Sequence, residues 1–251
     1  MSFYHKIFHN LHILIYFIGG ILGLFVGQFV DWCNLRLPEY KKVLSKDFFK
    51  EYLKNCKPKY ILMVIVAVSY IALLYFKGIS VDTFKFMFLI PMLLVAFVID
   101  YRLQIIPNRL TLTIFEVGIV FTFIETIMAI TVGINVFIDN ILGMIVGGGI
   151  FLLITLIGGA IAGKEAMGFG DVKFMGALGL FFGWLNIILI SVMSFLFAAI
   201  VSIIILITRR KKFTEYIPFG PFIVVASMIP IYISTPELML VILKIFSLGT
   251  Y

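Results

Sequence analysis

Long apolar stretches separated by short polar segments follow one another along the chain. A helix needs about 20 apolar residues to cross the hydrocarbon core of a bilayer, and most of the stretches reach that length. The pattern predicts an all-α, polytopic integral membrane helix bundle with about eight transmembrane helices. The stretches lie at about 12–30, 60–76, 84–100, 110–132, 137–161, 171–183, 185–208 and 221–233, with a further short run at 237–248.

The sixth stretch is shorter than a spanning helix. As an α-helix, DVKFMGALGLFFGW (residues 171–184) would be roughly 21 Å long. Either the membrane is thin at this point or the helix begins below the surface, and both arrangements would bring water to Asp171 in a protein-lined cavity.

Composition agrees with a bilayer as the solvent. Of the 251 residues, 62% are hydrophobic and 13% are charged, whereas a soluble domain has roughly 25% charged residues. The first stretch lacks a small-residue cleavage pattern, so we expect a retained anchor rather than a signal peptide. We expect one membrane-embedded domain over residues 1–251.

The basic residues predict the orientation. Residues 31–59 contain eight Lys and Arg, and the segments around 101–109, 164–173 and 209–212 contain eight more. With eight crossings these segments share one side, which the positive-inside rule makes cytoplasmic, with the N-terminus outside. This topology accounts for the net charge of +7, and no nucleic-acid partner is expected.

Two of the acids are predicted to meet at the cytoplasmic boundary, because Asp100 ends the third stretch and Asp171 begins the sixth. Each has a structural alternative: Asp171 could cap a helix, and Asp100 could pair with Arg102. As a pair they could hydrolyse a peptide bond without a metal, one carboxylate activating water and the protonated partner donating to the oxyanion. The dipoles of their helices predict that Asp100 more often holds the shared proton.

The other acids have simpler expected roles. Glu116 and Glu125 lie within the fourth stretch and are expected to hydrogen-bond to neighbouring helices, although an acid at this depth is also a functional candidate. Solvated charges are expected at Asp31, Glu39, Asp47, Glu51 and Glu215, and positions near the outer face at Asp82, Asp139 and Glu237.

Four segments, in order, resemble the type IV prepilin peptidases, which are polytopic aspartic proteases with a GxGD motif. The segments are DYRLQIIPNRLT (100–111), KEAMGFGDVKFMGALGLFFGW (164–184), YIPFGPF (216–222) and GLFVGQFVDWCNLRLP (23–38). The resemblance implies Asp100 and Asp171 as the catalytic pair. It also implies cleavage, at the cytoplasmic face, of a short basic leader just before the hydrophobic helix of pilin-like or pseudopilin precursors.

Residues around the pair are expected to support the site. Glycines let the backbone approach closely, and Lys173 either steadies a carboxylate or a substrate carbonyl or marks the membrane interface. The expected supporting residues are Gly168, Gly170, Lys173, Pro107, Asn108 and Glu165, and the expected substrate-lining residues are Pro218, Gly220 and Pro221. Gly143 and Gly147 to Gly149 are expected to allow close helix packing.

The first cytoplasmic loop departs from the resemblance. Bacterial members often carry two CxxC pairs there, but residues 31–59 contain only Cys33 and Cys56, so we expect no structural zinc. A short amphipathic helix is expected instead, with Val43, Phe48, Phe49 and Leu53 packed on the membrane or on the helix bundle. Proteolysis needs no cofactor, and methylation of the new N-terminus with S-adenosylmethionine, which many bacterial members perform, stays open.

Other functions also stay open. A small proton- or cation-coupled transporter could use the same acids, although it would place them nearer the membrane centre with access from both sides. The client could be an archaeal preflagellin or a presenilin-like substrate. The N-terminal NLRLP and the first loop favour a bacterial pilin or pseudopilin processor, multi-pass in the cytoplasmic (inner) membrane, with its active site facing the cytoplasm and with lipid as its other partner.

Overall fold

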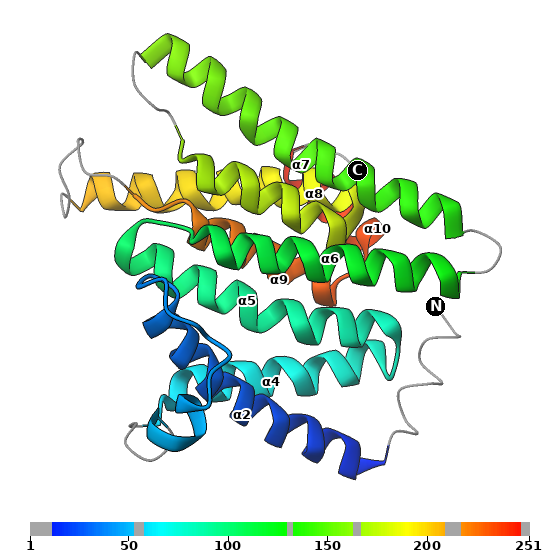
Figure 1. Ribbon diagram of the computed structural model, residues 1–251. Coiled ribbons are helices and arrows are strands. Elements are labelled where there is room, and N and C mark those ends of the chain that lie inside the picture. Colours follow the sequence, from blue (N-terminus) through cyan, green and yellow to red (C-terminus); the bar gives the residue numbers. More distant parts are fainter. Residues whose placement is uncertain (1–11, 53–57, 130–132, 163–166, 209–216, 247–251) are drawn as a thin grey trace. The chain divides into compact units, whose positions relative to one another are not determined.

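The computed structural model describes residues 12–52, 58–129, 133–162, 167–208 and 217–246. Every regular element in these residues is a helix (Figure 1). They are α2 (Ile13–Arg36), the π-helical turn η1 (Phe48–Tyr52), α4 (Tyr60–Lys77), α5 (Val81–Leu103), α6 (Asn108–Met128), α7 (Gly133–Ala162), α8 (Phe169–Ile207), α9 (Gly220–Tyr232) and α10 (Thr235–Phe246). The predicted all-α fold is confirmed.

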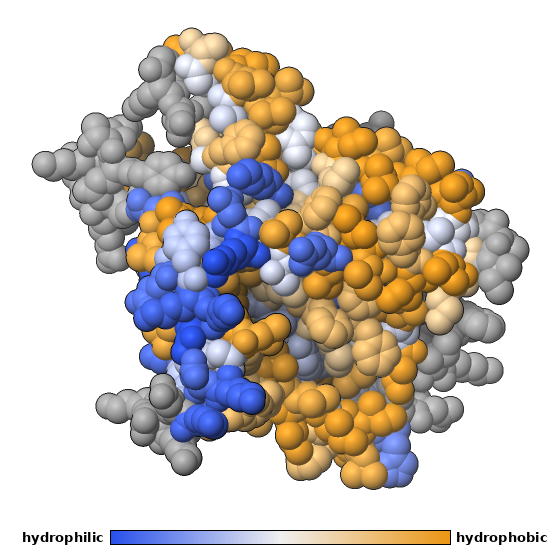
Figure 2. Space-filling view, in the orientation of Figure 1, coloured by the Kyte–Doolittle hydropathy of each residue, from blue (hydrophilic) through white to orange (hydrophobic). Residues whose placement is uncertain are grey.

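The described helices present the surface that a bilayer requires. Six of them, α2 and α4 to α8, are long and apolar enough to cross a membrane, and α9 is a shorter apolar helix. Figure 2 shows hydrophobic residues over most of the visible surface alongside the helices. Water would make such a surface costly, whereas lipid tails solvate it.

The chain forms two compact units, Met1–Ile99 and Asp100–Tyr251, with the boundary inside α5. The expected single domain over residues 1–251 stays a prediction. In the first unit, glycines of α2 bring two helices together. A Cβ atom on Gly23 would overlap the Ala67 backbone, and one on Gly27 would overlap the Met63 backbone, so α2 and α4 meet at backbone contact.

The loop after α2 is organised around Phe48. Its ring lies between 5.3 and 5.9 Å from the rings of Phe25, Phe29, Trp32 and Tyr52, measured between centroids. The expected packing is therefore confirmed at Phe48, which packs on α2. The Phe49 ring lies 5.1 Å from that of Phe48 and its side chain is exposed, so its packing on the membrane stays a prediction. Leu53 and Cys56 lie outside the described residues.

Asp31 is buried in the first unit, and its prediction as a solvated charge is wrong. The Tyr52 hydroxyl donates to Asp31 Oδ2 at 2.6 Å and accepts from Gln28 Nε2 at 2.8 Å. The reason is that α2 continues past the apolar stretch to Arg36, so Asp31 lies inside the helix. Glu39 and Asp47, in contrast, are surface acids paired with Lys41 and Arg36. Glu215 lies outside the described residues, as does the side chain of Glu51.

In the second unit, α8 consists of two segments joined at Gly183, whose φ of 73° and ψ of 174° are not helical. Gly147 of α7 lies against both Met175 and Ile187, which a straight helix would hold about 18 Å apart along its axis. The chain therefore reverses direction at Gly183 (Figure 1). This break falls between the predicted sixth and seventh stretches, and it explains why eight stretches correspond to fewer continuous helices.

Glycines pack α7 closely against α8. Gly143 lies in backbone contact with Gly179 and Gly183, and Gly148 faces Gly176 with no side chain between them. The expected packing role is confirmed at Gly143, Gly147 and Gly148. It is wrong at Gly149, because a Cβ atom there would meet nothing within 4 Å.

The helix ends that carry the site lie at one end of the second unit. The end of α5 and the starts of α6, α8 and α9 gather there (Figure 1). Gln104 ends α5 with a φ of 57°, its N–H donating to the Asp100 carbonyl at 2.8 Å, and Pro107 is the N-cap of α6. Pro107 and Asn108 therefore lie at the turn by which the chain passes from α5 into α6.

Candidate active site

Asp100 is buried in the last turn of α5, with 4% of its surface exposed. Its Oδ2 atom accepts a hydrogen bond of 2.9 Å from the backbone N–H of Gly220. Among the described residues no ion pair joins Asp100 to Arg102, so that structural alternative is wrong. The residue that Asp100 bonds to lies at the start of α9.

Gly220 can hold this bond for two reasons. It is the first residue of α9, where backbone N–H groups have no acceptor within the helix. A Cβ atom at this position would lie 2.6 Å from Asp100 Oδ2, so no other residue type fits without moving the carboxylate. Gly220 was predicted to line the substrate; in the structure it contacts Asp100. Pro221 beside it is buried, and Pro218 in the preceding loop is half-buried.

Asp171 is also buried, with 5% of its surface exposed, but its surroundings differ. Gly168 is the N-cap of α8 and no side chain caps the helix, so the prediction of an Asp171 cap is wrong. Asp171 lies in the first turn, near the positive end of the helix dipole. Its carboxyl group interacts electrostatically with that of Asp100, and it forms no hydrogen bond to any described residue.

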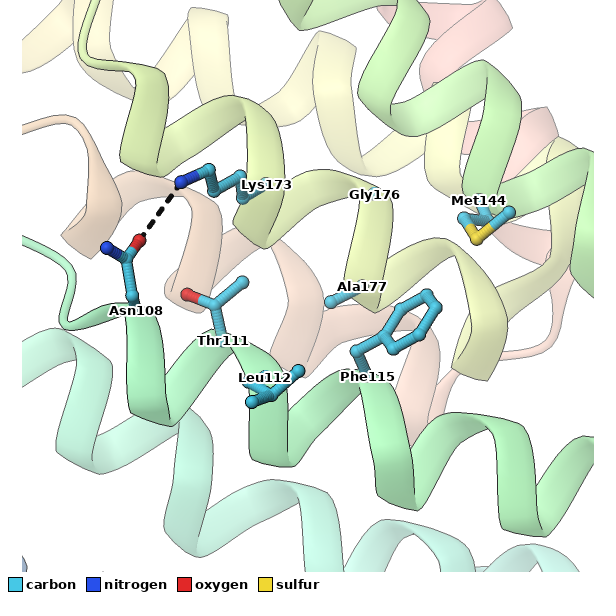
Figure 3. A pocket seen from close by; sticks show the side chains of 8 residues that line it. All are labelled: Asn108, Thr111, Leu112, Phe115, Met144, Lys173, Gly176 and Ala177. Carbon is cyan, nitrogen blue, oxygen red and sulfur yellow. Dashed lines mark hydrogen bonds between the residues drawn. The ribbon is translucent and has the colours of Figure 1, made fainter.

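Two contacts join the GFGD segment to the turn that follows Asp100. A Cβ atom on Gly170 would lie 3.5 Å from the Ile106 side chain, an ordinary van der Waals contact. Lys173 Nζ donates to Asn108 Oδ1 at 3.1 Å (Figure 3). The Lys173 ammonium therefore binds an amide rather than either aspartate. Glu165, an expected supporting residue, lies outside the described residues.

A cavity of about 410 Å³ lies between α6, α7 and α8 (Figure 3). Asn108 and Lys173 lie at one end of it, and neither Asp100 nor Asp171 lines it. Its walls are mainly apolar, with Leu112, Phe115, Met144, Gly176 and Ala177 among the lining residues.

The two acids of α6 differ from each other. Asn140 Nδ2 donates to Glu125 Oε2 at 3.1 Å, which confirms the expected bond to a neighbouring helix. Glu116 was expected to be bonded in the same way, and that expectation is wrong. Its side chain is exposed and forms no hydrogen bond or ion pair with any described residue. Sequence reasoning could not find this, because hydropathy does not tell which face of a helix turns outward.

The paired carboxyls form an arrangement suited to acid–base chemistry. Two buried carboxyl groups that interact cannot both ionise easily, so the pair tends to keep one proton. A backbone N–H can only donate, so Oδ2 of Asp100 acts as an acceptor. A proton on Asp100 would therefore sit on Oδ1. The prediction that Asp100 more often holds the proton stays a prediction.

In the described part of the chain, no group of three or more His, Cys, Asp or Glu side chains could hold a metal ion. Cys33, one of the two cysteines of the first loop, is buried at the end of α2.

Comparisons with known proteins agree with the resemblance. Residues 87–203, which include both aspartates, match the model of the type IV leader peptidase family. A prepilin leader peptidase/N-methyltransferase of Aeromonas hydrophila is 28% identical over 131 residues, which cover 52% of this chain and 43% of that protein. No solved structure gives a significant match.

Two other relatives carry the same name. The protein from Escherichia coli (strain K12) is 30% identical over 132 residues, covering 53% of this chain and 55% of its own length. The protein from Klebsiella pneumoniae is 25% identical over 190 residues, covering 73% and 80%. The chain spans about half the length of the first relatives it matches. The resemblance inferred from the four segments is confirmed.

Proposed function

We propose that this chain is a membrane aspartic endopeptidase that removes the short basic leader of pilin-like precursors. The observation that carries the proposal is that two carboxyl groups, one from the end of α5 and one from the first turn of α8, are both buried at the end of the unit where the GFGD segment packs against the turn after α5. They are close enough to interact electrostatically. The family match and the names of the relatives support the same activity. They do not favour the transporter alternative.

The proposed reaction uses the pair as acid and base. The ionised carboxylate takes a proton from water as the water oxygen attacks the scissile carbonyl carbon, and the protonated partner donates to the carbonyl oxygen. When the tetrahedral intermediate collapses, the C–N bond breaks and the leaving nitrogen takes up the proton that came from water. A hydroxyl proton of the intermediate returns to the carboxylate that had donated, which leaves a carboxylic acid and an amine and restores the pair with one proton. The carboxyl group of Asp171 has no hydrogen bond to a described residue, and we assign it to the binding of water and substrate.

The neighbouring residues are proposed to position this pair. Gly220 orients Asp100 through its N–H. The contact between Gly170 and Ile106 and the bond between Lys173 and Asn108 hold the start of α8 against the turn after α5. Gly168, Pro107 and Glu165 complete the proposed supporting set, and Pro218 and Pro221 are proposed to shape the entrance for substrate.

The proposed setting is the cytoplasmic face of a bacterial inner membrane. Arg102, Arg109 and Lys173 belong to the helix ends that gather around the site, and basic residues mark the cytoplasmic side. The precursor's basic leader would then meet two acids at the membrane surface. Lipid surrounds the spanning helices, and no nucleic acid is involved.

Methylation is a second, separate proposal, supported only by the names of the relatives. S-adenosylmethionine would supply the methyl group to the new N-terminus. Proteolysis itself needs no cofactor. Mass spectrometry of the mature N-terminus reports the cut site and any added methyl group together, so it tests the two activities independently.

Cleavage of a co-expressed pilin-like precursor tests the peptidase. We expect Asp100→Asn and Asp171→Asn each to lower cleavage on the order of 10²–10⁴-fold, the contribution typical of a general acid or base. Glu237→Gln is the matched control, because it removes an exposed acid of α10 in the same unit. Cleavage that survives both aspartate substitutions at the wild-type rate would refute the proposal.

A further inference from the structure

The cavity between α6, α7 and α8 lies close to the proposed catalytic pair without being part of it. Lys173, at one end of the cavity, follows Asp171 by two residues, and Asn108 at the same end binds Lys173. Gly176 and Ala177 continue along the same helix, about 8–9 Å beyond Asp171. The cavity therefore begins near the depth of the carboxyl pair and extends along the span (Figure 3).

The lining of this cavity suits another helix. Gly176 and Ala177 are small, which lets a neighbouring backbone approach α8 closely. Leu112, Phe115 and Met144 add apolar surface from α6 and α7. A volume of about 410 Å³ accommodates a few side chains rather than a whole helix. One face of a helix lying along the surface would fill it.

Glu116 provides a second, independent observation. It lies one helical turn beyond Leu112 on α6, exposed within an apolar spanning helix and not bonded to any described residue. An acid at such a position is costly against hydrocarbon. A lipid tail offers no hydrogen-bond donor, whereas a peptide segment does.

We propose that the surface formed by this cavity and Glu116, here called the α6–α8 groove, binds the apolar helical segment that follows the scissile bond of the substrate. The inference rests on the proposed peptidase function. Apolar side chains of the segment enter the cavity, and a polar group of the segment donates to Glu116. The segment's N-terminal end then lies near Lys173 and Asn108, which brings the scissile bond to the carboxyl pair.

Photo-cross-linking tests the groove. The probe is a synthetic precursor with a short basic leader followed by an apolar helix of about 20 residues. It is added to the full chain carrying Asp171→Asn, so that it is bound but not cut. A photoreactive amino acid replaces Leu112 in one sample and Ile145 in the other. These positions are 55% and 57% exposed, but Ile145 points about 100° around α7 from Met144.

We expect the precursor to be cross-linked when the photoreactive residue is at position 112. We expect no cross-link when it is at position 145. Equal capture at the two positions, or capture of lipid alone at position 112, would overturn the groove. Cleavage of the same precursor by the unmodified chain is measured in parallel. Cleavage without capture at 112 leaves the peptidase standing and overturns the groove, whereas capture without cleavage supports the groove and overturns the peptidase.

Substitutions at Glu116 test its part in binding. We expect Glu116→Leu to raise KM about tenfold with little change in kcat, because one hydrogen bond to the bound segment is lost. Glu116→Gln retains a hydrogen-bonding side chain and should recover most of the affinity. A fall in kcat at unchanged KM, or no change with either variant, would exclude Glu116 from the groove.

Discussion

Asp31 in the first unit and Asp171 in the second are buried to nearly the same extent, 7% and 5% exposed, yet their surroundings differ. The Tyr52 hydroxyl donates to the Asp31 carboxyl group at 2.6 Å, whereas the Asp171 carboxyl group has no hydrogen bond to a described residue and interacts electrostatically with a second carboxyl group. A buried polar group is normally satisfied by a partner, and one without a partner needs an explanation. Burial alone therefore does not distinguish these two acids. What distinguishes them is the interaction of Asp171 with a second carboxyl group, which is the feature that the proposed function uses.

Asp100 lies between these two cases, since one of its oxygens is bonded and the other is not bonded to a described residue. The hydrogen bond to Gly220 holds the side chain in place, as Tyr52 holds Asp31. The other oxygen, Oδ1, remains to take part in chemistry. Such a half-bonded carboxyl group suits a catalytic residue, which must be both oriented and reactive.

The largest expected effect is a difference in cleavage rate between alanine substitutions at two glycines near the aspartate pair. Gly220→Ala places a Cβ atom 2.6 Å from Asp100 Oδ2, so the carboxylate must move. A displacement of about 1 Å can lower an enzymatic rate on the order of 10²-fold. Gly170→Ala, within the GFGD motif, meets only an ordinary 3.5 Å contact with Ile106 and should change cleavage by a few-fold at most.

Cleavage rates of both glycine variants, with thermal unfolding as a control for folding, check this difference. A motif-based interpretation predicts the reverse order, with position 170 the more sensitive. If Gly170→Ala is the more damaging substitution, or Gly220→Ala cleaves at the wild-type rate, the bond from Gly220 does not position Asp100. A change in the pH profile of Gly220→Ala would further separate positioning from a general loss of stability.

A second prediction concerns Asp31, for which stability rather than activity should change. Tyr52→Phe removes the hydroxyl that donates to its buried carboxylate, which should cost about 1.5–3 kcal/mol of unfolding free energy. Cleavage per folded molecule should stay unchanged. Asp171→Asn should show the opposite pattern, with activity lost and stability retained, because the substitution breaks no hydrogen bond to a described residue.

Thermal unfolding in detergent and a cleavage assay on the same preparations measure both quantities. Tyr75→Phe serves as a control, since it removes a tyrosine hydroxyl from the exposed surface of α4 in the same unit. If Tyr52→Phe lowers the cleavage rate as much as Asp171→Asn does, Asp31 has more than a structural role.

The sequence predicted most of the helices and the two aspartates, because both depend on signals along the chain. Apolar length marks the spanning helices, and position at the ends of two apolar stretches marks Asp100 and Asp171. The break at Gly183 falls at the predicted division between the sixth and seventh apolar stretches. None of these signals depends on the orientation of a helix about its own axis, that is, on which of its faces is turned toward its neighbours.

The predictions that failed depend on the orientation of a helix about its axis or on the exact residue at which a helix ends. Asp31 was assigned to a loop because α2 extends beyond its apolar stretch. Glu116 was assigned a bonded position, but its face of α6 turns outward. The bond from Gly220 to Asp100 was missed rather than mispredicted, because finding it required the start of α9 to be placed against the end of α5, which is far away in sequence. The substrate-lining role expected of Gly220 stays a prediction. The Gly-Pro pair that opens α9 was a local signal of a helix start, but it did not identify its partner.

The smallest expected effect is a change in unfolding temperature caused by Asp47, an exposed acid that can be compared with the buried Asp31 and Asp171. The Ser45 hydroxyl and the Arg36 guanidinium lower the pKa of Asp47 from its ordinary value of 3.8. Because the folded pKa is the lower one, this pairing stabilises the protein above about pH 4, and its contribution is lost as pH falls through the folded pKa. Solvent screens the exposed pair, so the change in unfolding temperature should be slight.

Comparing Asp47→Asn with the unmodified chain over a falling pH series isolates this contribution. The two unfolding temperatures should differ slightly near neutral pH and converge below pH 4, since protonation removes the charge of Asp47 just as the substitution does. Added salt should shrink the difference at neutral pH, because the pair is open to solvent. A difference that persists at low pH, or that salt leaves unchanged, would mean that Asp47 acts through its hydrogen bonds rather than its charge, which would place it with Asp31 among the acids that hold the loop together.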